Sequence, residues 1–465
     1  MSTYDDLTDL TDAPELSAAD AAPADRLPRI TVFGTGYLGA THAVAMAQLG
    51  FDVTGVDTDL AKVEALAAGK VPFYEPGLPE LLEATLATGR LRFTTDAATA
   101  VANAEVHFVC VGTPQMKTSH AADLRFVEAA TTAVARAMTH DGVIVGKSTV
   151  PVGTAARLRE IVAREVAPGV AAELVWNPEF LREGKAVDDT LHPDRVVVGG
   201  ASPAAEALLR TVYAQPIAEG SPFVVTDLPT AELVKVSANA FLATKISFVN
   251  AIAQVCEAAG ADVTVLADAI GHDVRIGRQF LDAGLGFGGG CLPKDIRALM
   301  HRAGELGAHR AVALMQQVDE INMGQRAAVV DHAVEACGGS VLNRRIGVLG
   351  AAFKPHTDDV RDSPALNVAA ALHLRGAQVT VYDPQAGDTA RATFPSLTYA
   401  TSAEEAVEGT DVVLLLTEWE EFLRADPTQL AERTRTPRLI DARGKLDTDA
   451  WRAAGWTTRT LGRAA

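Results

Sequence analysis

Short apolar runs alternate with longer Ala-rich segments through the first half of the chain. The runs expected to form strands are residues 29–33, 51–57, 106–111, 143–147, 174–176 and 195–198. A helix is expected between the first two of them, over Ala40 to Leu49, with Gly50 as its end. Strands that alternate with helices are typical of a parallel, doubly wound α/β sheet.

A long apolar segment without Gly or Pro follows this region. It extends from Thr230 to Ala259, and Gly260 ends it. Thr230 is expected to cap the helix, with Glu232 in its first turn. A helix of this length between two α/β units is expected to serve as a spine or as a dimer surface.

The strand pattern returns near Asn343. Strands are expected at residues 346–350, 378–383, 412–416 and 439–441, which indicates a second doubly wound unit. Its first turn, Gly350-Ala-Ala-Phe-Lys354, lacks the full dinucleotide fingerprint, so it binds either a different nucleotide or none. The expected fold is therefore α/β, with two doubly wound Rossmann-like domains joined by a long central helix and a helical dimerisation region.

Charge and composition narrow the possible partners. The 465 residues contain 41 Lys and Arg against 59 Asp and Glu, a net charge of −18, which disfavours nucleic acid as a partner. No apolar run of membrane-spanning length and no secretory signal are recognised, so no membrane partner is expected. Four cysteines without metal-type spacing favour a reducing, cytoplasmic setting and predict no metal.

A glycine-rich turn joins the first strand to the first helix. Gly34, Gly36 and Gly39 form the pattern Gly-x-Gly-x-x-Gly, and Asp57 ends the next strand. Such a turn admits a pyrophosphate at a helix N-terminus, and an acid at that place binds the ribose 2′-OH, which favours NAD over NADP. The alternative is a glycine-rich turn without a ligand.

A second glycine-rich segment, residues 284–290, ends in Cys291, with Lys294 and Asp295 close behind. A nearby cation favours the nucleophilic thiolate. Beside bound NAD, a thiolate can add to an aldehyde and form a hemithioacetal, which donates a second hydride and becomes a hydrolysable thioester. The alternative is a small buried cysteine beside a flexible loop.

Two further groups of polar residues are candidates for chemistry. Lys235 and Asn239 lie four residues apart in the long helix among apolar neighbours, where Lys can stabilise an oxyanion or support proton transfer. Glu179 and Glu183 follow a strand and are candidates for activating water or orienting a substrate. The alternatives are a solvated Lys235 and a pair of surface acids partnered by Arg182.

The chain resembles the UDP-glucose/GDP-mannose dehydrogenase family over about residues 29 to 460. The segments that carry the resemblance are GTGYLG (34–39), FYEPGL (73–78), VGTP (111–114), KSTVPVGT (147–154), NPEFLREG (177–184), PDRVVVGG (193–200), AELVKVSANAFLATKISFVN (231–250), GHDVRIG (271–277), GFGGGCLPKD (286–295) and FKPHTDDVRDSP (353–364). NPEFLREG followed by PDR looks most like the UDP-glucose 6-dehydrogenase branch, whereas CLPKDIRAL is similar to the GDP-mannose branch.

The resemblance implies oxidation of UDP-glucose at C6 to UDP-glucuronate, with two NAD and one water, by a homo-oligomer that is at least a dimer. Cys291 is then the nucleophile. Lys235, Asn239 and Asp295 match positions that hold a catalytic water and stabilise the oxyanion. Glu179 matches the residue of thioester hydrolysis, and Thr149 a position that orients water.

The resemblance also implies two sets of binding residues. The cofactor set is Gly34, Gly36, Tyr37, Leu38, Gly39, Asp57, Lys62, Thr113, Glu183, Lys294 and Arg361. The substrate set is Glu179, Phe180, Leu181, Glu183, Lys235, Asn239, Arg275, Phe280, Leu281, Gly284, Gly288, Lys354 and Arg443, of which Arg275 is expected to reach the partner subunit's substrate.

These features predict four regions. They are an acidic disordered tail (1–27), an NAD-binding Rossmann-like domain (28–225), a central helical dimerisation domain with the cysteine loop (226–335) and a C-terminal Rossmann-like domain for the nucleotide sugar (336–465). Two departures from the family pattern, Gly290 for Ser and Leu292 for Phe, bear on sugar preference. The alternative functions are a dehydrogenase for GDP-mannose or another UDP-sugar, and an NAD-responsive binding protein without the reaction.

Overall fold

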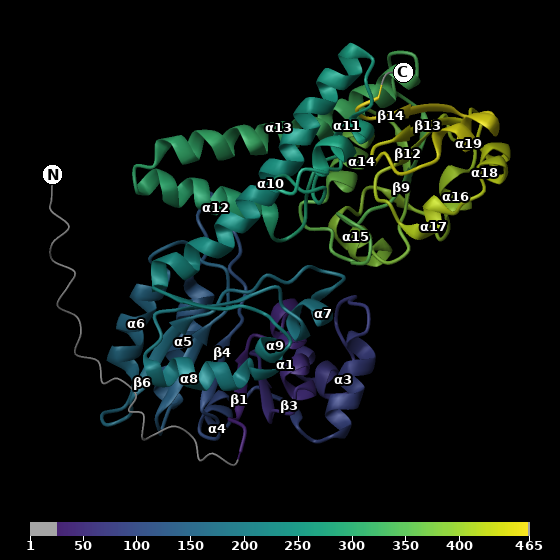
Figure 1. The fold of residues 1–465 in the computed structure, drawn as a ribbon. Coiled ribbons are helices and arrows are strands. Elements are labelled where there is room, and N and C mark those ends of the chain that lie inside the picture. Colours follow the sequence, from purple (N-terminus) through teal and green to yellow (C-terminus); the bar gives the residue numbers. More distant parts are fainter. Residues whose placement is uncertain (1–25, 464–465) are drawn as a thin grey trace. The chain divides into compact units, whose positions relative to one another are not determined.

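The computed structural model describes residues 26–463, which form two compact units divided between Ser237 and Ala238 (Figure 1). The predicted acidic tail, residues 1–27, lies outside the described residues except for Arg26 and Leu27. Each unit contains one β-sheet with helices packed against it.

The sheet of the first unit has eight strands in the order β3-β2-β1-β4-β5-β6-β7-β8. Every neighbouring pair is parallel except β6 and β7, which meet antiparallel at Trp176 and Gly199. The strands are β1 (Ile30–Phe33), β2 (Val53–Val56), β3 (Leu91–Thr94), β4 (Val106–Val109), β5 (Gly142–Gly146), β6 (Ala172–Trp176), β7 (Val196–Gly199) and β8 (Phe223–Thr226). The predicted doubly wound sheet is thus confirmed, with one antiparallel pairing that the apolar runs did not indicate.

Helices cover both faces of this sheet, which explains why its inner strands are apolar throughout. Val32 packs on one side with α1 (Tyr37–Gln48), α3 (Leu78–Ala87), α7 (Ala186–Leu191) and α8 (Pro203–Val212). Phe33 packs on the other side with α4 (Ala97–Val101), α5 (Arg125–Ala137) and α6 (Thr154–Glu165). The short helices α2 (Leu60–Ala67) and α9 (Ala214–Ala218) complete the unit.

The long helix α10 (Leu228–Ala259) begins two residues before the predicted Thr230. Asp227 accepts a hydrogen bond from the Thr230 backbone N–H at 2.7 Å, so Thr230 lies inside the first turn and its predicted capping role is wrong. Among the described residues, α10 is the one helix that is long and apolar enough to cross a membrane, by length and composition alone. Its polar side chains Glu232, Lys235 and Asn250 are buried within the protein, as in the core helix of a folded domain.

In the second unit, α10 packs against α11 (Val263–Gly271), α12 (Leu292–Glu305) and α13 (His309–Ala336). Ala240 and Ala243 of α10 contact Ile296 of α12, together with Met315 and Val318 of α13. Figure 1 shows α12 and α13 side by side. This packing fixes the N-terminus of α12, where the predicted cysteine lies.

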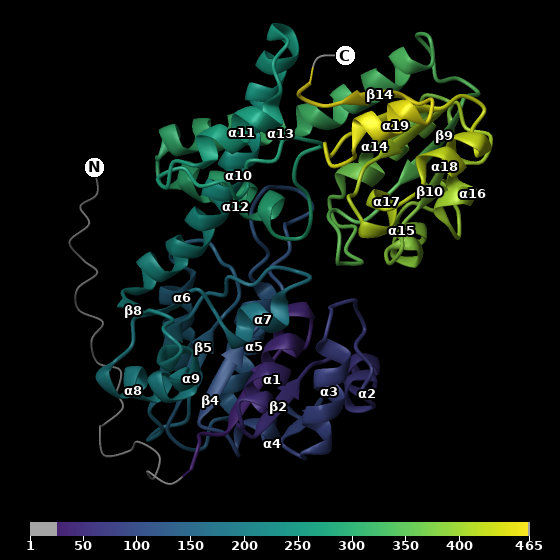
Figure 2. The ribbon, with the colours of Figure 1, turned by 45° about the vertical axis from the view of Figure 1, so that its right-hand side comes forward.

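The second sheet is parallel, in the order β11-β10-β9-β12-β13-β14 (Figure 2). Its strands are β9 (Arg345–Leu349), β10 (Gln378–Tyr382), β11 (Thr398–Tyr399), β12 (Val412–Leu415), β13 (Arg438–Asp441) and β14 (Thr457–Thr460). Its helices are α14 (Pro364–Leu374), α15 (Gly387–Thr393), α16 (Ala403–Val407), α17 (Glu420–Leu423), α18 (Pro427–Arg433) and α19 (Thr448–Ala453). The order around β9 repeats the order around β1, which confirms the predicted second doubly wound unit.

Candidate active site

Four candidate residues of the first unit follow the carboxyl ends of neighbouring strands. Gly34 follows β1, Thr113 follows β4, Thr149 follows β5 and Glu179 follows β6. The Thr113 hydroxyl donates to the Thr149 carbonyl oxygen at 2.6 Å, so two of these loops are in contact. The strand order reverses between β1 and β4, and ligands of open α/β sheets bind in the crevice at such a point.

The first glycine turn fits a dinucleotide. Gly34 has φ +85°, and a Cβ there would lie 2.8 Å from the Val111 side chain. A Cβ at Gly39 would lie 1.7 Å from the Gly34 carbonyl oxygen, whereas one at Gly36 would meet no atom within 4 Å. The turn is thus tight at its ends and open at Gly36. There the backbone N–H groups of Tyr37, Leu38 and Gly39 begin α1 and can bind a pyrophosphate.

Asp57 lies beside this turn at the end of β2. Its carboxylate accepts hydrogen bonds from the Thr35 backbone N–H at 2.8 Å and from Lys62 Nζ at 3.0 Å. Burial favours the neutral acid, but the hydrogen bonds from Asp59, Lys62 and Thr35 outweigh it and lower the pKa of Asp57. The position therefore presents a charged carboxylate, as the binding of ribose hydroxyls requires.

Lys235 and Glu179 form a buried ion pair in the first unit. The Nζ of Lys235 lies 3.1 Å from Oε1 of Glu179, and their side chains are 6% and 11% exposed. The ring of Phe180 lies beside Lys235, and the guanidinium of Arg195 stacks on that ring at 3.7 Å. The alternative of a solvated lysine is thereby excluded.

The alternative of surface acids fails as well. Glu183 is 7% exposed. Arg182 forms its ion pair with Asp189. The backbone N–H of Leu181 donates to Glu179 Oε2 at 2.7 Å, which fixes that carboxylate.

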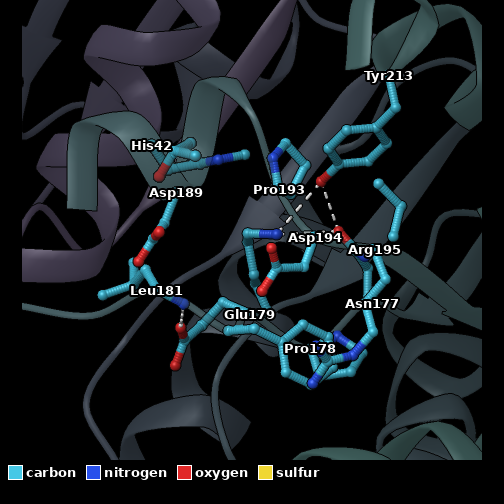
Figure 3. Close-up of a pocket in the computed structure, with 14 residues that line it drawn as sticks. His42, Asn177, Pro178, Glu179, Leu181, Asp189, Pro193, Asp194, Arg195 and Tyr213 are labelled. Carbon is cyan, nitrogen blue, oxygen red and sulfur yellow. Dashed lines mark hydrogen bonds between the residues drawn. The ribbon is translucent and has the colours of Figure 1, made fainter. Parts of the chain in front are cut away.

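A cavity of about 40 Å³ lies behind Glu179, and Figure 3 shows its lining. Lys147 Nζ donates to Asn177 Oδ1 at 3.0 Å and to the Tyr213 hydroxyl at 3.2 Å, and that hydroxyl donates to the same Asn177 oxygen at 2.5 Å. His42 also lines the cavity and is 1% exposed. This network fixes the first residue of the NPEFLREG segment.

Cys291 is the N-cap residue of α12 in the second unit, where the helix dipole favours negative charge. It is partly exposed, whereas the remaining cysteines of the chain, Cys110, Cys256 and Cys337, are buried. Burial raises the pKa of the Cys110 thiol to about 12. Among the four, Cys291 is thus the one placed to act as a nucleophile.

Asp295 connects this helix to α10. Its Oδ2 accepts a hydrogen bond from Asn239 Nδ2 at 2.7 Å, and Lys294 donates to its Oδ1. The Asp295 backbone N–H donates to the Cys291 carbonyl oxygen at 3.0 Å. The structure therefore brings four of the predicted catalytic and cofactor residues of this unit into one cluster.

The glycines before Cys291 are required by close packing. A Cβ at Gly286 would lie 2.4 Å from Asn322 Oδ1, one at Gly288 2.4 Å from the Asp362 carbonyl oxygen, and one at Gly290 2.2 Å from the guanidinium carbon of Arg361. The sequence predicted that these glycines admit a ligand. At these three positions the close neighbours are atoms of the protein itself.

The other predicted substrate residues of the second unit lie in several places. Phe280 has φ +63°, Leu281 is 2% exposed, and the Gly284 backbone N–H donates to Asn250 Oδ1 at 2.8 Å. Arg275, 86% exposed in its side chain, forms an ion pair with Asp273 on the surface. Within the second unit, Arg275 is not part of the cluster around Asp295.

Lys354 and Arg443 follow the carboxyl ends of β9 and β13. Arg443 donates from Nε to the Leu416 carbonyl oxygen at 2.7 Å, and from its other nitrogens to those of Gly286 and Phe353. It thereby joins the cysteine loop to the edge of the second sheet.

The first turn of the second sheet is closed by its own acid. Asp383 follows β10, as Asp57 follows β2, and is 6% exposed. It accepts hydrogen bonds from the backbone N–H groups of Ala351 and Ala352 at 2.7 and 2.9 Å, and from Trp419 Nε1 at 3.0 Å. The donors that would face a dinucleotide phosphate are therefore already bound within the protein.

Sequence reasoning missed three buried polar residues, namely Glu75, Lys147 and Tyr213. Glu75 and Lys147 belong to segments quoted for the family resemblance, FYEPGL and KSTVPVGT, which was the available signal. Tyr213 lies at the end of α8 and carried no signal. Burial raises the pKa of its phenol, and Lys147 acts in the opposite direction.

The open glycine turn with its charged acid, on a sheet of this topology, defines a dinucleotide-dependent oxidoreductase. Three successive parts of the chain match domains of one family. Residues 28–217 match the NAD binding domain, 229–324 the central domain and 347–448 the UDP binding domain of the UDP-glucose/GDP-mannose dehydrogenases. The chain belongs to the UDP-glucose/GDP-mannose dehydrogenase family.

Individual relatives agree with this assignment. The chain is 42% identical to a UDP-glucose 6-dehydrogenase of Rhizobium meliloti, over 94% of this chain and 99% of that protein. It is 41% identical to the UDP-glucose 6-dehydrogenase TuaD of Bacillus subtilis, over 94% of each chain. The structure of a UDP-glucose dehydrogenase from Pyrobaculum islandicum superposes with a TM-score of 0.87 at 38% identity, covering 96% of this chain and all of that chain.

Proposed function

We propose that this protein oxidises UDP-glucose at C6 to UDP-glucuronate, with two NAD and one water. The observation that carries the proposal is Cys291 at the N-terminus of α12, joined through Asp295 to Asn239. A simple alcohol dehydrogenase has no use for this thiol, whereas a four-electron oxidation needs a nucleophile that captures the aldehyde.

The first oxidation removes a hydride and a proton from the C6 alcohol and leaves an aldehyde. Bound NAD supplies the hydride acceptor. Gly34, Gly36, Tyr37, Leu38 and Gly39 hold its pyrophosphate, and Asp57 with Lys62 faces the ribose. Thr113, Glu183, Lys294 and Arg361 complete the cofactor site.

The second oxidation proceeds through the cysteine. The Cys291 thiolate adds to the aldehyde, and the hemithioacetal gives up a hydride to a second NAD and a proton to the site, which leaves a thioester. Lys235 and Asn239 stabilise the oxyanion. Asp295, Thr149 and Glu179 hold and activate the water that hydrolyses the thioester, releasing the carboxylate and regenerating the thiol.

The nucleotide sugar is bound by residues of both units. Glu179, Phe180, Leu181 and Glu183 contact it from the NPEFLREG segment. Phe280, Leu281, Gly284, Gly288, Lys354 and Arg443 contact it from the second unit. Residues 28–225 then form the NAD-binding domain, 226–335 the central domain and 336–465 the domain for the nucleotide sugar.

An exposed apolar stripe on α10 supports a homodimer. Phe241, Phe248 and Val255 recur every seven residues and are 66%, 50% and 60% exposed, so they lie on one face of the helix. A second copy of α10 would cover this stripe, and Arg275 would then reach the partner subunit. The free thiols of the chain support a cytoplasmic location.

The test is NADH release measured with UDP-glucose, GDP-mannose and N-acetylated UDP-sugars. UDP-glucose is expected to give two NADH per sugar and the highest kcat/KM. One NADH per sugar would contradict the thioester route. A higher kcat/KM with GDP-mannose or an N-acetyl sugar would move the assignment to that substrate.

A further inference from the structure

Glu75 is a buried carboxylate that joins two segments far apart in the sequence. It is 2% exposed. The backbone N–H of Gly184 donates to its Oε2 at 2.7 Å, and that of Ala186 to its Oε1 at 2.7 Å. The Tyr37 hydroxyl also donates to Oε2. Glu75 thus spends both oxygens on partners from residues 37 and 184–186.

Tyr37 takes part in this contact and in the cofactor turn. Its backbone N–H is at the first position of α1, on the open side of the glycine turn. Its hydroxyl reaches away to Glu75, and it also accepts a hydrogen bond from the Gly184 N–H at 3.0 Å. Its ring packs against Phe73, with centroids 4.9 Å apart. A ligand on the N–H groups of α1 therefore acts on the residue that contacts Glu75.

Gly184 and Ala186 end the segment that carries both candidate acids, Glu179 and Glu183. Ala186 is the first residue of α7, so Glu75 satisfies an N–H group that the helix itself leaves unpaired. The other end of the segment is fixed at Asn177 by Lys147 and Tyr213. The end at Gly184 is fixed through Glu75 and Tyr37, and so by the cofactor turn.

We propose that Glu75 is a positioning residue that couples the NAD pyrophosphate site, through Tyr37, to the placement of Glu179 and Glu183. The inference rests on the proposed function, since those acids are assigned there to water activation and cofactor contact. Such coupling is reciprocal, so disturbing the segment also weakens the binding of the dinucleotide.

Hydrogen exchange of the full-length protein with and without NADH tests the coupling without any sugar. Wild type is expected to show slower exchange at the Gly184 and Ala186 amides when NADH is bound. Tyr37→Phe removes only the hydroxyl and keeps the ring and the backbone, so NADH should no longer slow these amides. Tyr74→Phe is the matched control, because the Tyr74 hydroxyl makes no hydrogen bond with the described residues.

Activity and affinity give the second readout. Tyr37→Phe and Glu75→Gln are each expected to raise the Kd for NADH about fivefold and to lower kcat with UDP-glucose about tenfold. The double variant should be no worse than Glu75→Gln alone, because both changes break one link. Where Glu75→Gln does not fold, the exchange experiment on Tyr37→Phe decides.

The outcomes separate this inference from the proposed function. NADH-dependent protection of Gly184 that persists in Tyr37→Phe, or additive losses in the double variant, would overturn the coupling. Equal acceleration of exchange with and without NADH would reduce Glu75 to a structural residue. A wild type that shows the protection but does not oxidise UDP-glucose would refute the proposed function and leave the coupling intact.

Discussion

Asn239 on α10 donates a hydrogen bond to Asp295 on α12, with 2.7 Å between Nδ2 and Oδ2. The two side chains are 7% and 3% exposed, so neither exchanges its partner easily for water. Lys294 donates to the second oxygen of Asp295. The amide of Asn239 is thereby held in one orientation, with its carbonyl oxygen turned away from Asp295.

Asp295→Asn is expected to lower kcat with UDP-glucose by about 10²- to 10⁴-fold, because the water near the thioester loses its base. The new amide also presents a donor or a poorer acceptor to Asn239. The reciprocal double variant Asn239→Asp/Asp295→Asn restores a donor and an acceptor at this contact and should recover part of the loss. Steady-state kinetics of the single and double variants measure this, and strictly additive losses would contradict a direct pair.

Cys291→Ala should lower net turnover by at least about 10³-fold, because the aldehyde is no longer captured. NADH affinity should remain within about twofold, as the thiol is not a cofactor contact. Cys291→Ser should accumulate a sugar ester at position 291, visible as a mass increase of the intact protein, because an alkoxide leaves less readily than a thiolate. Cys256→Ala, at a buried thiol, is the control and should keep its activity. A large loss of NADH affinity in Cys291→Ala would indicate a structural role instead.

Asp57→Ala should reduce the preference for NAD over NADP in kcat/KM by about 10- to 100-fold, the worth of a hydrogen bond to a charged group. The same change leaves Lys62 without its carboxylate partner, which further favours a 2′-phosphate. Asp52→Ala, at an exposed acid that pairs loosely with Arg90, is the control. Unchanged discrimination in Asp57→Ala would remove this residue from the ribose site.

Two buried histidines make stability fall in acid. Burial lowers the pKa of His107 to about 3 and that of His42 well below its usual value. Below about pH 6.5 the unfolded chain therefore binds protons that the folded protein does not, and the free energy of unfolding decreases by up to about 1.4 kcal/mol per pH unit for each histidine. Denaturant unfolding between pH 7.5 and 5.5 measures the slope.

His42→Leu should make that slope shallower by about one proton. His272→Gln, at an exposed histidine, is the control and should leave the slope unchanged. An identical slope in His42→Leu and wild type would mean that His42 is protonated in the folded protein.

Phe248→Glu should convert a dimer to monomers in sedimentation velocity, because a charge in the apolar stripe of α10 must be desolvated on association. Phe126→Glu is the matched control, since Phe126 is 52% exposed on α5, outside the stripe. A dimer that survives Phe248→Glu would place the interface elsewhere.

The central strands of both sheets were predictable because they are apolar on both faces, as in Val143–Gly146 of β5. The edge strands β3, β8, β11 and β14 were not. β14, for example, reads Thr-Thr-Arg-Thr and has no apolar run, since only a neighbouring strand makes it a strand. The single antiparallel pairing of β7 with β6 likewise depends on the path of the chain through α7, which a strand pattern does not encode.

The candidate site was predictable where one short segment carries the chemistry, as at Gly34–Gly39 and Cys291. It was not where contacts join distant segments. Lys147 and Tyr213 are separated by 66 residues, and Glu75 and Gly184 by 109. The start of α10 was misplaced because Thr230 and Asp227 are both acceptable caps, and only the backbone geometry decides between them.

The closure of the second glycine turn by Asp383 limits how the protein can handle its oxidant. Within residues 26–463, one turn of this type remains open to a dinucleotide, yet each sugar must give up two hydrides. The spent NADH must therefore depart and a fresh NAD must arrive while the sugar is half processed. The bond to Cys291 is then also a tether, which keeps the intermediate from diffusing away during that exchange.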